Sequence, residues 1–182
     1  SFGLNKYLIL SDPNKNDFSN SIMIKALKNT DERIKNNQSV TPGFLMAALL
    51  WPILISKCSK DGEVNIRKFF RSMDGVLREQ QKLTAIPRKF NSYIKDIWVL
   101  QLKLHSRIKS QPYKTIRHPR FRAAYDFLLV REQASGDKNG LGKWWTDFQK
   151  NDDSLRGSLI TRMNEKSDEE SSKIFGFFEE LR

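Results

Sequence analysis

TPGFLMAALLWPILISK, residues 41–57, is apolar on nearly every side of a helix. Thr41 and Pro42 favour a helix start, because Thr caps exposed backbone N–H groups and Pro fits the first helical position. A helix that is apolar all round is a buried helix, so we expect this one at the centre of the fold. Pro52 lacks a backbone N–H and predicts a kink within it.

Helical patterns continue outward from this stretch, whereas the alternating pattern of a strand is nearly absent. Pro112 is expected to end the helix that begins near Pro87, and residues 136–142 are expected to form a loop. The fold class is therefore all-α, with a kinked hydrophobic helix at its centre. Further helices are expected at about 18–36, 64–83, 86–111 and 118–135, around Trp144, and twice in the tail.

The composition points to a polyanionic partner. The 182 residues include 32 basic and 21 acidic side chains, a net charge of +11 that favours nucleic acid over an anionic membrane. No apolar run approaches the roughly 20 residues that span a bilayer. A single cysteine, Cys58, cannot form an internal disulfide, which indicates a reducing, cytoplasmic location. Because the first residue is Ser1 and not Met, we expect a processed or excised fragment.

The charge divides the chain into three expected regions. Residues 1–87 carry a net charge of +5 and are predicted to form a helical body. Residues 88–150 carry +9 and are predicted to form a basic helical RNA-binding region. Residues 151–182 carry −3 and are predicted to form an acidic helical tail.

A gap in the acidic residues is the strongest functional signal. No Asp or Glu occurs from Ile97 to Tyr125, although this window holds seven Lys or Arg residues. A solvated basic face with no partner would also be basic, but it would not explain the missing acids. Phosphate binding with counterion release uses such an uncompensated cluster, so we favour RNA. The candidate RNA-binding residues are Lys89, Lys103, Arg107, Lys109, Lys114, Arg117, Arg120 and Arg122.

Individual candidates have alternative roles. Helical spacing places Lys89, Lys103 and Arg107 on one side of a single helix, where they could form a basic strip. Arg122 precedes Asp126 by four residues, so a local salt bridge competes with RNA binding there.

Aromatic residues are interpreted mainly as core. Trp144 and Trp145 could stack on bases. Adjacent helical residues point about 100° apart, so at least one of the two must be buried, and we favour two core residues. Trp98 and Tyr125 lie within apolar stripes and are interpreted as core.

We find no catalytic constellation in the sequence. It contains no P-loop, no dinucleotide-binding glycine pattern and no paired-cysteine metal spacing. Two histidines, His105 and His118, are too few for an HD-type phosphohydrolase and, with one cysteine, argue against a zinc site. The acidic cluster at residues 168–170 follows Ser167 and is typical of a helix cap. No metal site is expected in this chain.

Several phrases resemble the bacterial poly(A) polymerase family of the class II nucleotidyltransferases. The most specific is HPRFRAAYD, residues 118–126. The others lie, in the family's order, at residues 27–34, 42–52, 83–88, 96–102 and 143–149.

The resemblance implies that separate parts of the enzyme have separate roles. Such enzymes have a head with metal-binding carboxylates, a neck that selects the nucleotide, and helical body and RNA-binding parts. The head and neck motifs are missing here, so the resemblance implies Mg²⁺ and ATP in a missing head and no activity for this chain alone. The parent enzyme would add AMP from ATP to RNA 3′ ends and promote RNA decay. The family's basic extreme tail is missing too, since residues 151–182 are acidic.

The expected partners are single-stranded RNA 3′ ends, the chain's own head and neck, and RNA-decay proteins. Two alternatives stay open. One is the body of a CCA-adding tRNA nucleotidyltransferase, a close relative. The other is a helical protein–protein scaffold whose charge serves solubility.

Overall fold

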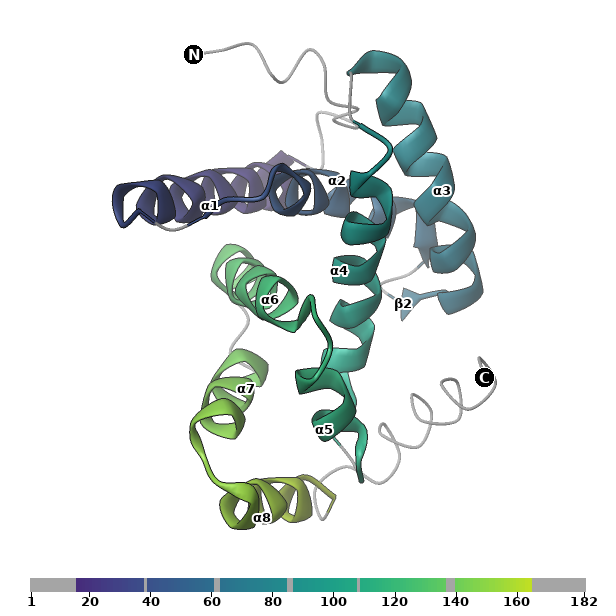
Figure 1. Cartoon of the computed structure of the whole chain (residues 1–182). Helices are drawn as coiled ribbons and strands as arrows, with labels where there is room; N and C mark the ends of the chain where they lie inside the picture. Colours follow the sequence, from purple (N-terminus) through teal and green to yellow (C-terminus); the bar gives the residue numbers. More distant parts are fainter. Residues whose placement is uncertain are drawn as a thin grey trace.

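Eight helices and one short hairpin make up the part of the chain that the computed structural model describes, residues 16–37, 39–60, 63–84, 87–107, 109–136 and 140–164. The strands Ser59–Lys60 (β1) and Glu63–Val64 (β2) pair antiparallel. The helices, drawn in Figure 1, are α1 (Asn16–Lys35), α2 (Pro42–Cys58), α3 (Ile66–Leu83), α4 (Phe90–His105), α5 (Gln111–Ile116), α6 (Phe121–Ser135), α7 (Leu141–Lys150) and α8 (Asp153–Asn164).

The apolar helix α2 is central, as its sequence predicts. It begins at Pro42, continues through Pro52 and is buried along most of its length. Helices α1, α3 and α4 all pack against it. The indole Nε1 of Trp98 on α4 donates to the backbone carbonyl of Ala47 at 2.9 Å. Pro52 has no N–H to donate to the carbonyl of Ala48, four residues earlier. The carbonyl that Trp98 bonds is the neighbouring one. The predicted kink stays a prediction.

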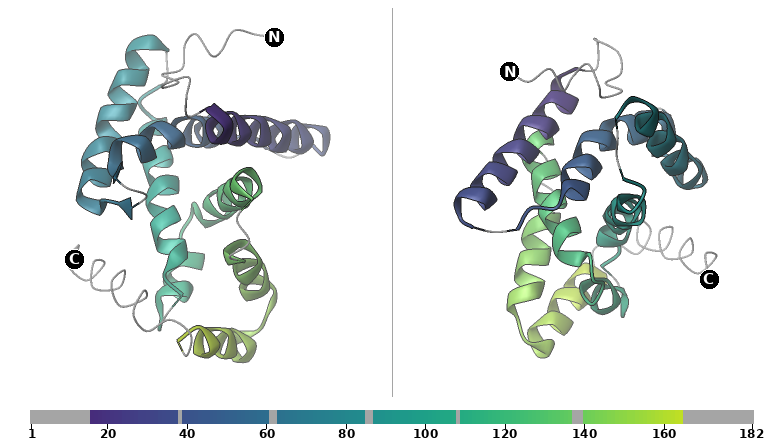
Figure 2. Two further views of the ribbon diagram at one scale, coloured as in Figure 1. Left: turned by 180° about the vertical axis from the view of Figure 1, so that it is seen from behind. Right: turned by 45° about the horizontal axis from the view of Figure 1, so that its top comes forward.

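Helix α4 connects two hydrophobic cores. Its first half contributes Ile94, Ile97 and Trp98 to a core shared with α1, α2, α3 and part of α6. Its second half contributes Leu100 and Leu104 to a second core with α6, α7 and α8. In Figure 1 α4 stands between α3 and α6, and Figure 2 shows α1 lying against α6 from two further directions. The expected boundaries at residues 87 and 150 stay predictions.

The second core contains both neighbouring tryptophans, which confirms the preference for packing over base stacking. Trp145 is fully buried and Trp144 is 7% exposed. The Trp145 Nε1 donates to the carbonyl of Leu104 at 2.9 Å and so ties α7 to the end of α4. Trp98 and Tyr125 are also buried, as expected.

Local sequence explains the start of α3 and the end of α6. Asn65 caps α3 by accepting from the backbone N–H of Lys68 at 2.9 Å. Helix α6 ends at Ser135 and is followed by Gly136, whose φ of 67° is the left-handed conformation that glycine adopts without strain. The predicted loop after residue 136 is confirmed at its start, and α7 begins at Leu141.

Two expectations about elements were wrong. Pro112 does not end the preceding helix, because α4 already ends at His105 and Pro112 lies in the first turn of the separate helix α5. Proline at a first turn loses no hydrogen bond, so it is compatible with a start as well as a stop. The β1–β2 hairpin was not predicted, since each strand has only two residues. The predicted second tail helix, which begins at Ser167, lies outside the described residues.

Candidate nucleic-acid interface

The eight predicted RNA-binding residues fall into two groups along α4. The first group lies at the start of α4. Lys89 lies 5.3 Å from the ring of Phe90, and Arg120 lies 4.7 Å from the ring of Tyr93, which is one turn further along α4. Arg122 lines the same pocket as Tyr93. The second group lies at the other end of α4 and on α5, which contacts it. This group consists of Lys103, Arg107, Lys109, Lys114 and Arg117.

The second group covers a tight connection between helices. Lys103 is in the last turn of α4, and Lys109 follows with a positive φ of 48°. Lys114 on α5 and Arg117 at its C-cap are both exposed. Arg107 lies 6.0 Å from the ring of Trp144. Of this group, Lys109, Lys114 and Arg117 are exposed on and beside the short helix, whereas Lys103 and Arg107 are half-buried.

The predicted strip of Lys89, Lys103 and Arg107 on one helix was wrong. Only Lys103 lies within α4, because Lys89 is its N-cap and the helix has ended before Arg107. The sequence pattern continued at helical spacing past the true end, and Ser106 has an extended conformation there.

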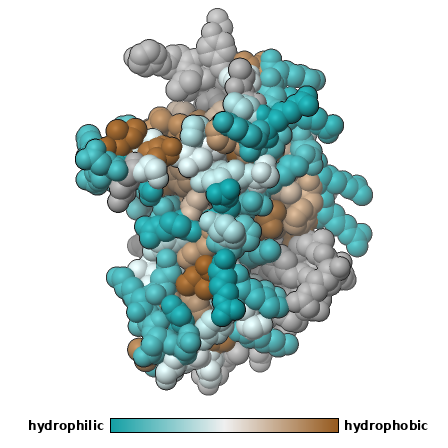
Figure 3. Space-filling view, in the orientation of Figure 1, coloured by the Kyte–Doolittle hydropathy of each residue, from teal (hydrophilic) through white to brown (hydrophobic). Residues whose placement is uncertain are grey.

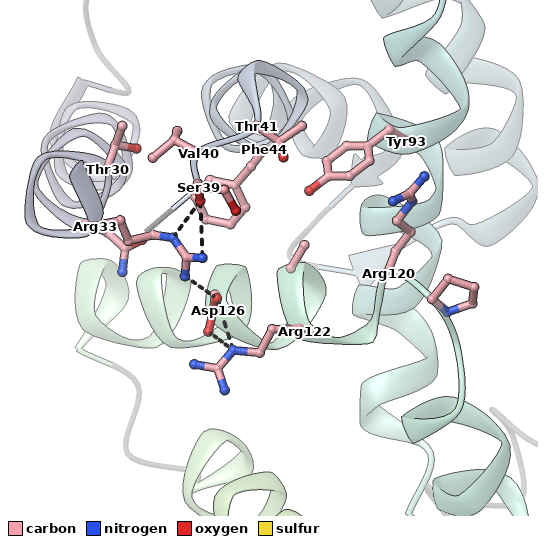
Figure 4. A pocket seen from close by; sticks show the side chains of 13 residues that line it. Thr30, Arg33, Ser39, Val40, Thr41, Phe44, Tyr93, Arg120, Arg122 and Asp126 are labelled. Atoms are coloured by element: carbon pink, nitrogen blue, oxygen red, sulfur yellow. Dashed lines mark hydrogen bonds and ion pairs between the residues drawn. The ribbon is translucent and has the colours of Figure 1, made fainter. Parts of the chain in front are cut away.

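A pocket lies between α1, α4, α6 and the segment that leads into α2. Its volume is about 220 Å³. Figure 4 shows Arg33, Arg120 and Arg122 around it, with the rings of Phe44 and Tyr93 on the side of α2 and α4. The pocket therefore combines cationic side chains with flat apolar surfaces.

Asp126 holds two of these arginines. Arg33 Nη1 lies 3.1 Å from Asp126 Oδ2, and Arg122 Nε lies 3.1 Å from Asp126 Oδ1. The Asp126 side chain is 11% exposed, whereas that of Arg122 is 71% exposed. The local Arg122–Asp126 salt bridge is thus confirmed as a contact. It leaves most of the Arg122 side chain accessible to a ligand.

Arg120 is held differently, by an aromatic ring. Its guanidinium lies over the ring of Tyr93, and cation–π attraction favours this placement. No carboxylate of the described residues forms an ion pair with it. Tyr93 in turn packs against Gly43 at the start of α2, where a side chain's Cβ would come within 2.7 Å of the Tyr93 ring. Glycine at this position allows α2 and α4 to approach closely beside the pocket.

Sequence reasoning missed three residues of this pocket. Arg33 and Tyr93 belong to apparently ordinary helices, and Asn29 on α1 carries a buried Oδ1 with no hydrogen-bond partner among the described residues. Asn29 and Arg33 lie within the resembling phrase at residues 27–34. No local pattern marks any of the three as a site residue, because they meet Arg120 and Arg122 only through the tertiary fold.

A row of cations on α3 was also missed. Helical geometry places its members within about 60° of one another around the helix, and all are exposed. The four-residue spacing at each end of the row could have indicated it. The row consists of Arg67, Arg71, Arg78 and Lys82.

The described part of the molecule offers charge more than reactivity. Its His, Cys, Asp and Glu side chains form no group of three that could hold a metal ion. Burial raises the pKa of the Cys58 thiol above its ordinary value, and the thiol donates to the carbonyl of Leu54 at 2.7 Å. Hydrophilic residues cover much of the face in Figure 3. Within the described ranges no helix is both long and apolar enough to cross a membrane.

The fold and the interface together define a helical module with a basic, arginine-bearing surface. The family model described as "Polymerase A arginine-rich C-terminus" matches residues 61–174, more than half of the chain. The chain belongs to this family.

Curated relatives agree with this assignment. "Poly(A) polymerase I" of Escherichia coli O6:H1 (strain CFT073) is 38% identical over 134 residues, which cover 70% of this chain and 29% of that protein. "Poly(A) polymerase I" of Salmonella typhi is 37% identical over the same shares. "Poly(A) polymerase I" of Haemophilus influenzae (strain Rd) is 34% identical over 151 residues, 80% of this chain and 33% of that protein. The chain thus spans about a third of the length of these relatives.

Proposed function

We propose that this chain binds single-stranded RNA through its phosphates and presents the 3′ end to the catalytic head of a poly(A) polymerase. The supporting observation is the clustering of exposed cations between α4 and α5, on α5 and at the start of α6, within the acid-free window. Phosphate contacts of this kind give affinity without reading sequence.

The surface is suited to a flexible backbone. Three exposed cations follow one another closely in the sequence: Lys114 on α5, Arg117 at its C-cap and Arg120 at the N-cap of α6. Among the described residues none of the three forms an ion pair with a carboxylate. A negatively charged strand can therefore approach without displacing an internal partner.

The chemistry of the reaction would lie elsewhere in the parent enzyme. The relatives are named poly(A) polymerases, and a catalytic head would hold Mg²⁺ and ATP and transfer AMP to the RNA 3′ end. The residues described here contain no carboxylate cluster for that metal. The chain would therefore supply positioning and not catalysis, and we expect it to be inactive alone. A single buried cysteine fits a reducing compartment, and we place the protein in the cytoplasm.

Crosslinking to RNA followed by peptide mapping tests this proposal. The full chain is irradiated with unstructured RNA at low salt, and we expect crosslinked peptides from residues 87–122. An equal mass of folded tRNA should compete no better than unstructured RNA. Preferential competition by tRNA would favour a CCA-adding relative. Absence of crosslinks at low salt would favour a protein scaffold.

A further inference from the structure

The pocket between α1 and α6 has features that a phosphate-binding surface alone does not require. Its walls include the ring of Phe44, the ring of Tyr93 and the methyl group of Ala123. Phosphate needs only donors and positive charge. An apolar wall beside cations suits a ligand that has a flat ring next to an anionic group.

The size of the pocket limits what can enter it. Sites for whole small-molecule ligands are typically about 300–1,000 Å³. The volume here, about 220 Å³, is smaller. A space of this size suits one flat nucleobase, and the phosphate of the same nucleotide would then lie at the rim.

The rim carries charge suited to that phosphate. Arg33, Arg120 and Arg122 contribute three positive charges, and Asp126 neutralises one of them. The Arg120 guanidinium is fixed over Tyr93 at 4.7 Å and has no carboxylate partner within the described ranges. Arg120 is therefore the best-placed donor for an anion outside the pocket, and Asp126 keeps the other two arginines in position.

One polar atom in the wall lacks a partner. The Oδ1 of Asn29 is buried and accepts no hydrogen bond from any described residue. The atom is closed to solvent, so it can accept from a ligand only if the Asn29 side chain turns toward the pocket that it lines. A buried acceptor without a donor costs free energy, so such a turn toward a donating ligand would be favourable. Exocyclic amino groups of adenine and cytosine are donors of this kind.

From these observations we propose that the pocket holds one base of the bound RNA strand, with an amino-bearing base preferred. The 5′ or 3′ phosphate of that nucleotide lies against Arg120. This inference rests on the proposed function, since it assumes that RNA reaches this surface, and it adds a stacked base to the phosphate contacts.

The test compares RNA with and without bases. Fluorescence anisotropy measures binding of the full chain to oligomers of about 12 nucleotides, within the range of single-strand sites. The probes are oligo(A), oligo(C), oligo(U) and a ribose-phosphate oligomer that lacks bases. We expect oligo(A) and oligo(C) to bind about fivefold to tenfold more tightly than the baseless oligomer, the lower range for one stacked base. The affinity for oligo(U) should lie between that for oligo(A) and that for the baseless oligomer.

Variants locate the effect. Ala123→Leu fills the pocket, and Asn29→Leu removes the buried acceptor at similar volume. Ala123→Leu should bring oligo(A) and the baseless oligomer close to equal affinity. Asn29→Leu should reduce the preference of oligo(A) over oligo(U). Gln133→Leu, on the exposed side of the same helix α6, is the matched control and should behave as wild type.

The two proposals fail in different ways. Equal affinity of the wild type for oligo(A) and the baseless oligomer would overturn the base pocket, while a steep salt dependence of both would leave phosphate binding intact. A base preference that survives in Ala123→Leu would overturn it as well, because the base would then stack elsewhere. No binding of any oligomer at low salt would remove the proposed function itself. Thermal melting checks that each variant is folded. The comparison of oligo(A) with the baseless oligomer uses the wild-type chain and does not depend on any variant.

Discussion

Arg33 on α1 and Asp126 on α6 are 93 positions apart in the sequence, and their side chains meet at 3.1 Å. The guanidinium also donates to the backbone carbonyl of Ser39, before α2. One arginine thus joins the end of α1, the approach to α2 and the first half of α6. Asp126 is the acceptor that fixes this arrangement.

Replacing Asp126 with Asn should therefore lower stability. Breaking a buried ion pair costs about 3–5 kcal/mol, but the arginines here are 29% and 71% exposed, which screens the loss. We expect a decrease of about 1–3 kcal/mol in the free energy of unfolding, measured by urea denaturation. Asp147→Asn is the control, since its exposed pair with Lys143 should contribute about 0–1 kcal/mol. Equal effects of the two variants would show that the Arg33 link is not structural.

The helices could be predicted because their signal is local. The apolar stripe of α3 recurs every three or four residues, and the stretch from Thr41 to Lys57 is apolar all round. Helix α5 was missed because six residues are too few to show a period, and Pro112 was taken as a stop. Helical spacing also predicted that α4 would extend past His105.

The pocket could not be predicted in the same way. Its walls come from four separate segments, and among the lining residues the sequence predicted only Arg120 and Arg122 as RNA-binding. Contacts such as Arg33 with Asp126 depend on how α1 packs on α6, which no local pattern encodes. The acid-free window showed that this region is rich in basic residues. It could not show which arginines form internal ion pairs and which remain open to solvent.

Removing Lys114, Arg117 and Arg120 together should weaken RNA binding and leave the fold intact. All three side chains are exposed, and exposed charges contribute little to folding. We expect the midpoint of thermal unfolding to stay close to wild type, while the salt dependence of RNA binding becomes shallower. Thermal melts and RNA titrations of the same preparation measure both effects.

The matched control removes three exposed cations outside the acid-free window, Lys35, Lys150 and Arg162. It carries the same change in net charge and should bind RNA more tightly than the first triple variant. If the first variant melts much earlier than wild type, its side chains are structural. If both variants bind alike, net charge and not the α5 surface determines affinity.

Cys58 should make stability depend on pH in the alkaline range. Burial raises the pKa of its thiol, so the folded state binds the thiol proton more tightly than the unfolded state. This contribution favours folding fully below the unfolded pKa of about 8.5 and is lost as the pH rises toward the folded pKa. The difference in unfolding free energy between wild type and Cys58→Ala should therefore shrink above that pH. A constant difference would contradict the account of the buried thiol.

The chain alone should not extend RNA. Its described residues contain no group of acids able to hold a metal ion, and its matched residues cover only 29% to 33% of its relatives. Incubation with ATP, Mg²⁺ and an RNA primer should leave the primer length unchanged on a denaturing gel. Steady tailing by the purified chain, absent from a mock preparation, would show that a catalytic site exists within it.

The salt dependence of RNA binding tests phosphate binding most directly. For a single strand, each phosphate contact contributes about −0.7 to the slope of log K against log salt concentration. With about 3 to 6 contacts we expect a slope between about −2 and −4 for the wild-type chain, similar for RNAs of different sequence. A flat slope, or an affinity that depends strongly on sequence at every salt concentration, would contradict the claim that this surface binds RNA through its phosphates.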